Sequence, residues 1–207
     1  MNGINVICRA DVKVYNKNLP CVAVDAGLFY CLRNNLDILI AIGDFDSIAP
    51  EILASYQGEI IKVSAEKDQS DLELALDHLK DAKESLYVYG ALGGRMDHCL
   101  VNLKLCYYSD LDLYLIDEQN IICRLDRGLH HIADCGYTYV SFIAFENCTL
   151  SLTGFKYPLC DYYLAVSDNL TLSNEIVDDV VAVETDKPIL MIFSNDKPER
   201  QNEDPAL

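Results

Sequence analysis

The stretch LYVYGALGGRMDHCLVNLKLCY, residues 86–107, decides the expected fold because it joins a short strand to a helix through a glycine-rich turn. Residues 86–89 are apolar and end at a glycine, as a short buried strand does. Residues 97–107 have the length and composition of a helix. Strands that alternate with helices build layered α/β domains, in which most strands run parallel.

The rest of the first half repeats this alternation. Further strand-like runs lie at residues 5–10, 22–24, 38–42, 59–63 and 111–116. Residues 71–79 carry apolar side chains near helical spacing, and Ser70 with Glu73 has the pattern of a capping box at a helix start. Ligands of such sheets bind at the carboxyl ends of the strands. We therefore expect the functional site of the first half at these ends.

The second half lacks helical periodicity. Short strand-like runs follow one another at residues 137–145, 148–152, 162–165, 171–172, 179–183 and 188–193. This pattern is typical of an all-β sandwich or barrel. We predict an α/β domain over residues 1–122, a β-sandwich over residues 126–195, and a flexible polar tail over residues 196–207.

Composition excludes several classes of partner. The formal net charge of −17 disfavours nucleic acid and anionic membranes as ligands of the surface as a whole. No apolar run is long enough to span a bilayer, and residues 1–9 do not have the pattern of a signal peptide. The nine cysteines show neither C-x-x-C nor zinc-ligand spacing, so we expect free thiols. These features predict a cytoplasmic protein.

Aspartates and glycines gather where the predicted strands end. The clusters are DAG at 25–27, GDFDS at 43–47, KDQSD at 67–71 and GALGGRMDH at 90–98. Each cluster alone is also what ordinary turns and helix caps contain. Together they indicate more, because Asp44 and Asp46 lie two residues apart and can share one hard cation. Mg²⁺ prefers such oxygen ligands and leaves positions for substrate phosphates.

The glycine run has the composition of a phosphate-binding turn. Gly93 and Gly94 let backbone N–H groups come close to a phosphate just before a helix begins. Arg95 adds a planar fork of donors for phosphate oxygens. The spacing is neither that of a Walker A loop nor G-x-G-x-x-G. The residues by themselves therefore predict Mg²⁺-dependent phosphate chemistry without naming a reaction.

Six segments resemble the thiamine pyrophosphokinase family, in the same order along the chain. They are VAVDAG (22–27), IAIGDFDSI (40–48), KDQSDLELAL (67–76), GALGGRMDH (90–98), LTGFKYPL (152–159) and LTLSNEI (170–176). The resemblance implies an α/β catalytic domain followed by a β-sandwich, and a homodimer with active sites between the subunits. It further implies transfer of the pyrophosphoryl group of ATP to the hydroxyl of thiamine.

The resemblance also implies roles for particular residues. Asp44, Asp46 and Asp71 match the acidic residues around Mg²⁺ and the catalytic centre. The positions expected to line the ATP and pyrophosphate region are Asp25, Lys67, Asp68, Gly93, Gly94, Arg95, Asp97 and His98. Ser173 and Asn174 match the segment that helps to hold thiamine, from the partner subunit.

This chain departs from the family pattern at a few positions. Ala26 stands where members usually have glycine, and Tyr157 stands where many have tryptophan, which keeps an aromatic ring. Asn169 and Leu172 also differ, beside the thiamine segment. Two other functions stay open at this point: a nucleotide pyrophosphohydrolase with water as nucleophile, and a thiamine-binding sensor without catalysis. The intact acidic centre favours an enzyme over a sensor.

Overall fold

The computed structural model describes residues 3–64 and 68–196. The chain divides into two compact units. Among the described residues, the first unit contains residues 3–64, 68–118 and 122–124, and the second contains residues 119–121 and 125–196. Strand β7 (Asn120–Leu125) has residues in both. No helix in the described part of the chain is both long and apolar enough to cross a bilayer.

The first unit is built on a parallel sheet. Its strands are β1 (Gly3–Ile7), β2 (Cys21–Val24), β3 (Ile38–Gly43), β4 (Ile60–Lys62), β5 (Ser85–Tyr89) and β6 (Leu113–Ile116). They lie side by side in the order β4-β3-β2-β1-β5-β6, and each neighbouring pair runs parallel. All residues of β1 and β2 are buried, as expected for central strands that are covered on both faces. The predicted α/β fold class is confirmed.

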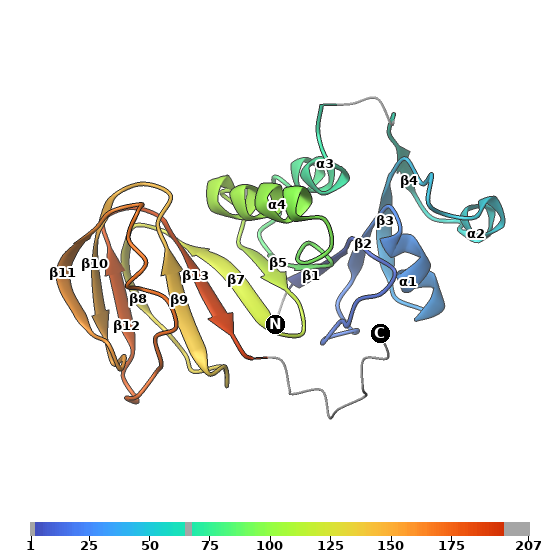
Figure 1. The fold of residues 1–207 in the computed structure, drawn as a ribbon. Helices are drawn as coiled ribbons and strands as arrows, with labels where there is room; N and C mark the ends of the chain where they lie inside the picture. Colours follow the sequence, from blue (N-terminus) through green and yellow to red (C-terminus); the bar gives the residue numbers. More distant parts are fainter. Residues whose placement is uncertain (1–2, 65–67, 197–207) are drawn as a thin grey trace, which may run out of the picture. The chain divides into compact units, whose positions relative to one another are not determined.

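Four helices connect these strands. They are α1 (Gly27–Arg33), α2 (Pro50–Ser55), α3 (Asp71–His78) and α4 (Met96–Tyr108). Figure 1 shows α3 and α4 side by side, and residues of both line one surface groove. The predicted start of α3 is confirmed, because the Ser70 hydroxyl oxygen accepts a hydrogen bond from the Glu73 N–H at 3.2 Å. We did not predict α1 or α2. Helix α1 begins at Gly27 close to β1, and a Cβ on Gly27 would lie 1.8 Å from the Ile7 carbonyl oxygen.

The second unit is a β-sandwich (Figure 1). Its strands after β7 are β8 (Gly128–His131), β9 (Tyr139–Ile143), β10 (Cys148–Thr153), β11 (Leu159–Leu164), β12 (Ala182–Thr185) and β13 (Ile189–Ser194). One sheet has the antiparallel order β11-β10-β12-β8, and β9 pairs antiparallel with β13. Cys148, Leu150 and Leu152 of β10 point inward, so every second residue is buried. The predicted sandwich is confirmed.

One predicted strand is wrong. Residues 171–172 form part of a turn. Ser173, which follows, has a φ of +53°, and this conformation cannot continue an extended strand. The Thr171 hydroxyl instead donates a 2.6 Å hydrogen bond to the Phe142 carbonyl. The Phe142 N–H also donates to the Thr171 carbonyl at 3.1 Å, so Thr171 is bound to β9 through both its backbone and its side chain although no strand forms at residues 171–172.

Candidate active site

Three carboxylates meet at the carboxyl ends of β2 and β3. Asp25, Asp44 and Asp46 each have an oxygen within 4.8 Å of the oxygens of the other two. The two strands end together because Val24 pairs with Ile42, and the Asp25 N–H donates to the Ile42 carbonyl at 2.9 Å. Carboxylate oxygens at this spacing form a donor set suited to a hard divalent cation such as Mg²⁺.

In the GDFDS turn, Phe45 points into the core, and the aspartates on either side of it do not. Phe45 is only 4% exposed and has a φ of +59°, whereas Asp46 is exposed. The Asp46 N–H donates to Asp44 Oδ1 at 3.1 Å, which closes the turn. Gly43 packs directly against the neighbouring strand end, since a Cβ there would lie 3.0 Å from the backbone of Asp25. Glycine at 43 therefore lets Asp25 approach the turn.

Burial and nearby negative charge both disfavour the ionised form of Asp25. Its Oδ2 accepts a 3.2 Å hydrogen bond from Ser47 Oγ, while its buried Oδ1 has no hydrogen-bond partner among the described residues. Burial raises the pKa of Asp25, and the negative charges of Asp71 and Asp44 raise it further; hydrogen bonds from Ala26 and Ser47 oppose this rise. A bound cation would supply the missing partner and relieve the repulsion, so the residues present fit a metal.

This repulsion leads to a stability prediction for the metal-free protein. Because the pKa of Asp25 is higher in the folded state than in the unfolded state, the ionised side chain destabilises the fold at neutral pH. We expect Asp25→Asn to raise the Tm at pH 7 in the presence of a chelator. The Tm difference should shrink as the pH falls through the folded-state pKa, where wild-type Asp25 takes up a proton. Asp81→Asn, at an exposed position, serves as the control; equal Tm values at pH 7 would contradict the prediction.

A cavity of about 760 Å³ opens beside the cluster at this edge of the sheet. Its lining residues are Cys8, Arg9, Val24, Asp25, Asp44, Asp46, Gln69, Ser70, Asp71, Leu72, Gly90, Ala91, Gly93, Gly94, Arg95, His98 and Asn102. Most of the residues predicted from sequence for the acidic centre and the phosphate region are among them. Asp68 and Asp97 are not in this lining, and Lys67 lies outside the described residues.

The glycine turn after β5 borders the same cavity. Gly90, Gly93 and Gly94 have φ values of +87°, +76° and +69°, in the left-handed region that favours glycine. Arg95 follows, and its Nε and Nη2 donate to Asp97 Oδ1 and Oδ2 at 3.1 and 2.5 Å. This contact lowers the pKa of Asp97 to about 2. The two hydrogen bonds from Arg95 to Asp97 hold the guanidinium in one orientation.

Comparison with known proteins assigns the family. Residues 12–116 match the family model for the thiamin pyrophosphokinase catalytic domain, and residues 129–190 match the one for its vitamin B1 binding domain. The thiamine pyrophosphokinase of Bacillus subtilis (strain 168) is 36% identical over 166 residues, which cover 75% of this chain and 78% of the relative. The chain belongs to the thiamine pyrophosphokinase family.

Solved structures of the thiamine pyrophosphokinase family have the same fold. The crystal structure of the Bacillus subtilis thiamine pyrophosphokinase is 29% identical, with a TM-score of 0.80, over 95% of this chain and 100% of the other. That of a thiamin pyrophosphokinase family protein from Enterococcus faecalis is 26% identical, with a TM-score of 0.83, over the same shares. The resemblance inferred from the six sequence segments is confirmed.

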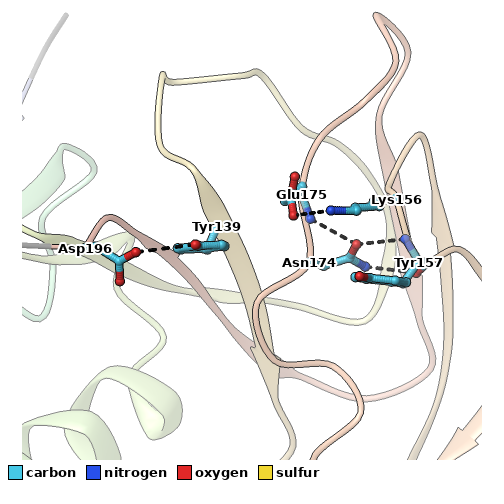
Figure 2. Close-up of polar contacts among 6 residues, drawn as sticks. All are labelled: Tyr139, Lys156, Tyr157, Asn174, Glu175 and Asp196. Carbon is cyan, nitrogen blue, oxygen red and sulfur yellow. Dashed lines mark hydrogen bonds and ion pairs between the residues drawn. The ribbon is translucent and has the colours of Figure 1, made fainter.

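Asn174 lies in the part that matches the vitamin B1 binding domain, and its side chain hydrogen-bonds to the backbone (Figure 2). Its side chain is 2% exposed. Nδ2 donates to the Tyr157 carbonyl at 2.9 Å, and Oδ1 accepts from the N–H groups of Tyr157 and Glu175 at 2.9 and 3.0 Å. The amide is thus engaged with backbone, and it fixes the segment that carries the 56% exposed Tyr157.

The residues near Asn174 make further contacts. Lys156 Nζ contacts Glu175 Oε1 at 2.6 Å, which adds a second link between the same two segments (Figure 2). Ser173 is exposed, and its backbone N–H donates to Ser141 Oγ at 2.9 Å. Ser173 and Tyr157 therefore present accessible groups, whereas Asn174 faces inward.

Several residues that line the cavity were missed by sequence reasoning. Arg9, Gln69 and Asn102 belong to this group, and Asn102 Nδ2 donates to the Ala91 carbonyl at 2.7 Å, which ties α4 to the glycine turn. Arg9 was missed because it falls inside the strand predicted at residues 5–10, whereas β1 ends at Ile7 and leaves Arg9 beyond the strand end, where ligand-binding residues of parallel sheets lie. No sequence pattern pointed to Asn102, because the hydrogen-bond partner of an asparagine inside a helix cannot be predicted from the sequence.

Proposed function

We propose that this chain transfers the pyrophosphoryl group of ATP to the hydroxyl of thiamine, which yields thiamine diphosphate and AMP. Membership of the thiamine pyrophosphokinase family supports this function. The observation that carries the mechanism is the cluster of three carboxylates beside the glycine turn, in one cavity. Such a site can hold a divalent cation against a polyphosphate chain.

The reaction forms one P–O bond and breaks another. The thiamine hydroxyl oxygen attacks the β-phosphorus of ATP, the bond from this phosphorus to the oxygen bridging it to the α-phosphorus breaks, and AMP leaves with that oxygen. Enzymes accelerate such transfers mainly by positioning the reactants and stabilising charge on the phosphoryl oxygens. Bound Mg²⁺ would supply part of that stabilisation.

The acidic residues divide into two proposed roles. Asp44 and Asp46, predicted as metal ligands from sequence, would hold Mg²⁺ together with Asp25, whose unpartnered Oδ1 lies in the same cluster. Asp71, the third ligand predicted from sequence, lines the same cavity. We assign it to the thiamine hydroxyl, which it would orient and whose proton it would receive.

The phosphate-binding residues surround the glycine turn. Arg95, held by Asp97, would bind phosphate oxygens through its free donors, and Gly93 and Gly94 would let the phosphates approach the backbone. His98 lines the cavity next to them. The predicted contributions of Lys67 and Asp68 remain proposals from the family pattern.

The second unit would bind thiamine, and its match to the vitamin B1 binding domain supports this. Ser173 is exposed and suited to direct contact, whereas the buried Asn174 would act by holding the Tyr157 segment. The formal charge of −17 favours a cationic substrate such as the thiazolium of thiamine. We further propose, from the family pattern, a cytoplasmic homodimer with active sites shared between subunits.

A product assay tests this function. We expect purified protein with ATP, Mg²⁺ and thiamine to form AMP and thiamine diphosphate in equal amounts. Removal of the metal with EDTA should stop both products, and excess Mg²⁺ should restore them, because the carboxylate cluster alone repels the phosphates. AMP formation without thiamine would indicate a hydrolase, and thiamine binding without turnover would indicate a sensor.

A further inference from the structure

Arg9 is a second arginine at the rim of the phosphate region, and it leaves one end of its guanidinium unused. Its Nε donates to Asp11 Oδ1 at 3.0 Å and its Nη2 donates to Asp11 Oδ2 at 2.8 Å. Nη1 has no hydrogen-bond partner among the described residues. It lies 3.4 Å from where a Cβ on Gly94 would stand, so it faces the glycine turn.

This geometry repeats that of Arg95. Each arginine follows a strand end, and each is gripped at Nε and Nη2 by an aspartate two residues later in the chain. The two strands, β1 and β5, are parallel neighbours whose last residues pair, Ile7 with Tyr89. Both arginines line the 760 Å³ cavity. Asp11 and Asp97 offset the charge of the two arginines but leave guanidinium N–H donors that can bind phosphate oxygens beside this cavity.

Gly90 gives Arg9 the room to take this position. A Cβ at residue 90 would lie 3.0 Å from both the Cβ and the backbone nitrogen of Arg9. The φ of +87° at Gly90 also disfavours any other residue there. Arg9 and Gly90 both line a second cavity of about 280 Å³ as well, next to Lys13 and Tyr89. Arg9 therefore stands where the two cavities meet.

We propose that Arg9 binds the polyphosphate of the nucleotide substrate through Nη1, as a partner of Arg95. Asp11 holds the guanidinium in place, so little side-chain freedom is lost on binding. The proposal rests on the proposed function for the identity of the substrate. The role of Arg9 can be tested without the complete reaction, because phosphate binding can be measured in the absence of thiamine.

Equilibrium binding of two probes in the presence of Mg²⁺ tests the assignment. The first is α,β-methylene-ATP, in which the bond that breaks in the proposed reaction is replaced, and the second is inorganic tripolyphosphate. We expect Arg9→Ala to weaken both probes by about 10- to 100-fold, as for the loss of a hydrogen bond between charged groups. Arg9→Lys should recover part of the affinity, because it keeps the charge and loses the fork. Arg33→Ala, which removes an exposed arginine over the Phe29 ring, should change neither affinity.

The outcomes separate this proposal from the proposed function. In the product assay, Arg9→Ala should raise the KM for ATP and leave the KM for thiamine within about twofold. Unchanged affinity for both probes would overturn the proposal and leave Arg9 a structural partner of Asp11. Weaker nucleotide binding with unchanged tripolyphosphate binding would also overturn it, since Arg9 would then contact the nucleoside.

If wild-type protein makes no thiamine diphosphate, the proposed function is wrong, while the tripolyphosphate result still decides the role of Arg9. Circular dichroism and thermal melts establish that each variant is folded.

Discussion

Asp46→Asn is expected to lower the rate of thiamine diphosphate formation by about a thousandfold, which corresponds to about 4 kcal/mol of lost transition-state stabilisation. Asp46 is exposed and lies on the GDFDS turn with its carboxylate in the three-membered cluster. Asparagine keeps the shape of the side chain and its backbone contact to Asp44 but removes the negative charge. The proposed cation site then loses one of its three charged ligands, and the phosphoryl oxygens lose the cation that neutralises them.

The measurement is the initial rate of AMP and thiamine diphosphate formation at saturating Mg²⁺. A thermal melt should show that the Asp46→Asn variant is folded and at least as stable as wild type, because the mutation reduces repulsion among carboxylates. Asp81→Asn changes the same functional group at an exposed site away from the cavity and should leave the rate unchanged. A decrease of less than tenfold in Asp46→Asn would contradict the assignment of this carboxylate to the catalytic centre.

Asn174→Ala is expected to lower the free energy of unfolding by about 2–4 kcal/mol and to raise the KM for thiamine by at least about tenfold. The mutation removes three hydrogen bonds from a side chain that is 2% exposed, and leaves backbone groups of Tyr157 and Glu175 without partners. The segment that carries Tyr157 then loses its fixed position, and the proposed thiamine surface becomes less ordered.

Urea unfolding and steady-state kinetics check the two effects separately. Asn147→Ala is the matched control, because Asn147 also makes two side-chain hydrogen bonds, to Tyr163 and Val166, but is exposed. It should cost less than about 1 kcal/mol and leave the KM for thiamine unchanged. A loss of stability in Asn174→Ala without any change in this KM would show that Asn174 has no part in thiamine binding.

Local patterns in the sequence were sufficient for the elements that frame the site. The strand–turn–helix of residues 86–107 and the Ser70 cap of α3 depend on hydrophobic period and capping residues a few positions apart, and both are present in the structure. The pairing of Asp44 with Asp46 was predictable for the same reason, since both carboxylates belong to one short turn. The strand predicted at residues 171–172 failed because the chain turns at Ser173, whose φ is +53°, and the β-branched side chain of Thr171 does not reveal this turn.

Tertiary structure decided which groups meet across the chain. Asp25 joins Asp44 and Asp46 because β2 and β3 end side by side, and Arg9 faces Gly94 because β1 lies between β2 and β5. This strand order does not follow the order of the chain, so spacing in the sequence carries no information about it. Asn174 likewise turns inward only because the Tyr157 backbone lies within hydrogen-bonding distance. The sequence by itself therefore determined the fold class, the family and the kinds of group in the site, whereas the close contacts among those groups depend on long-range packing.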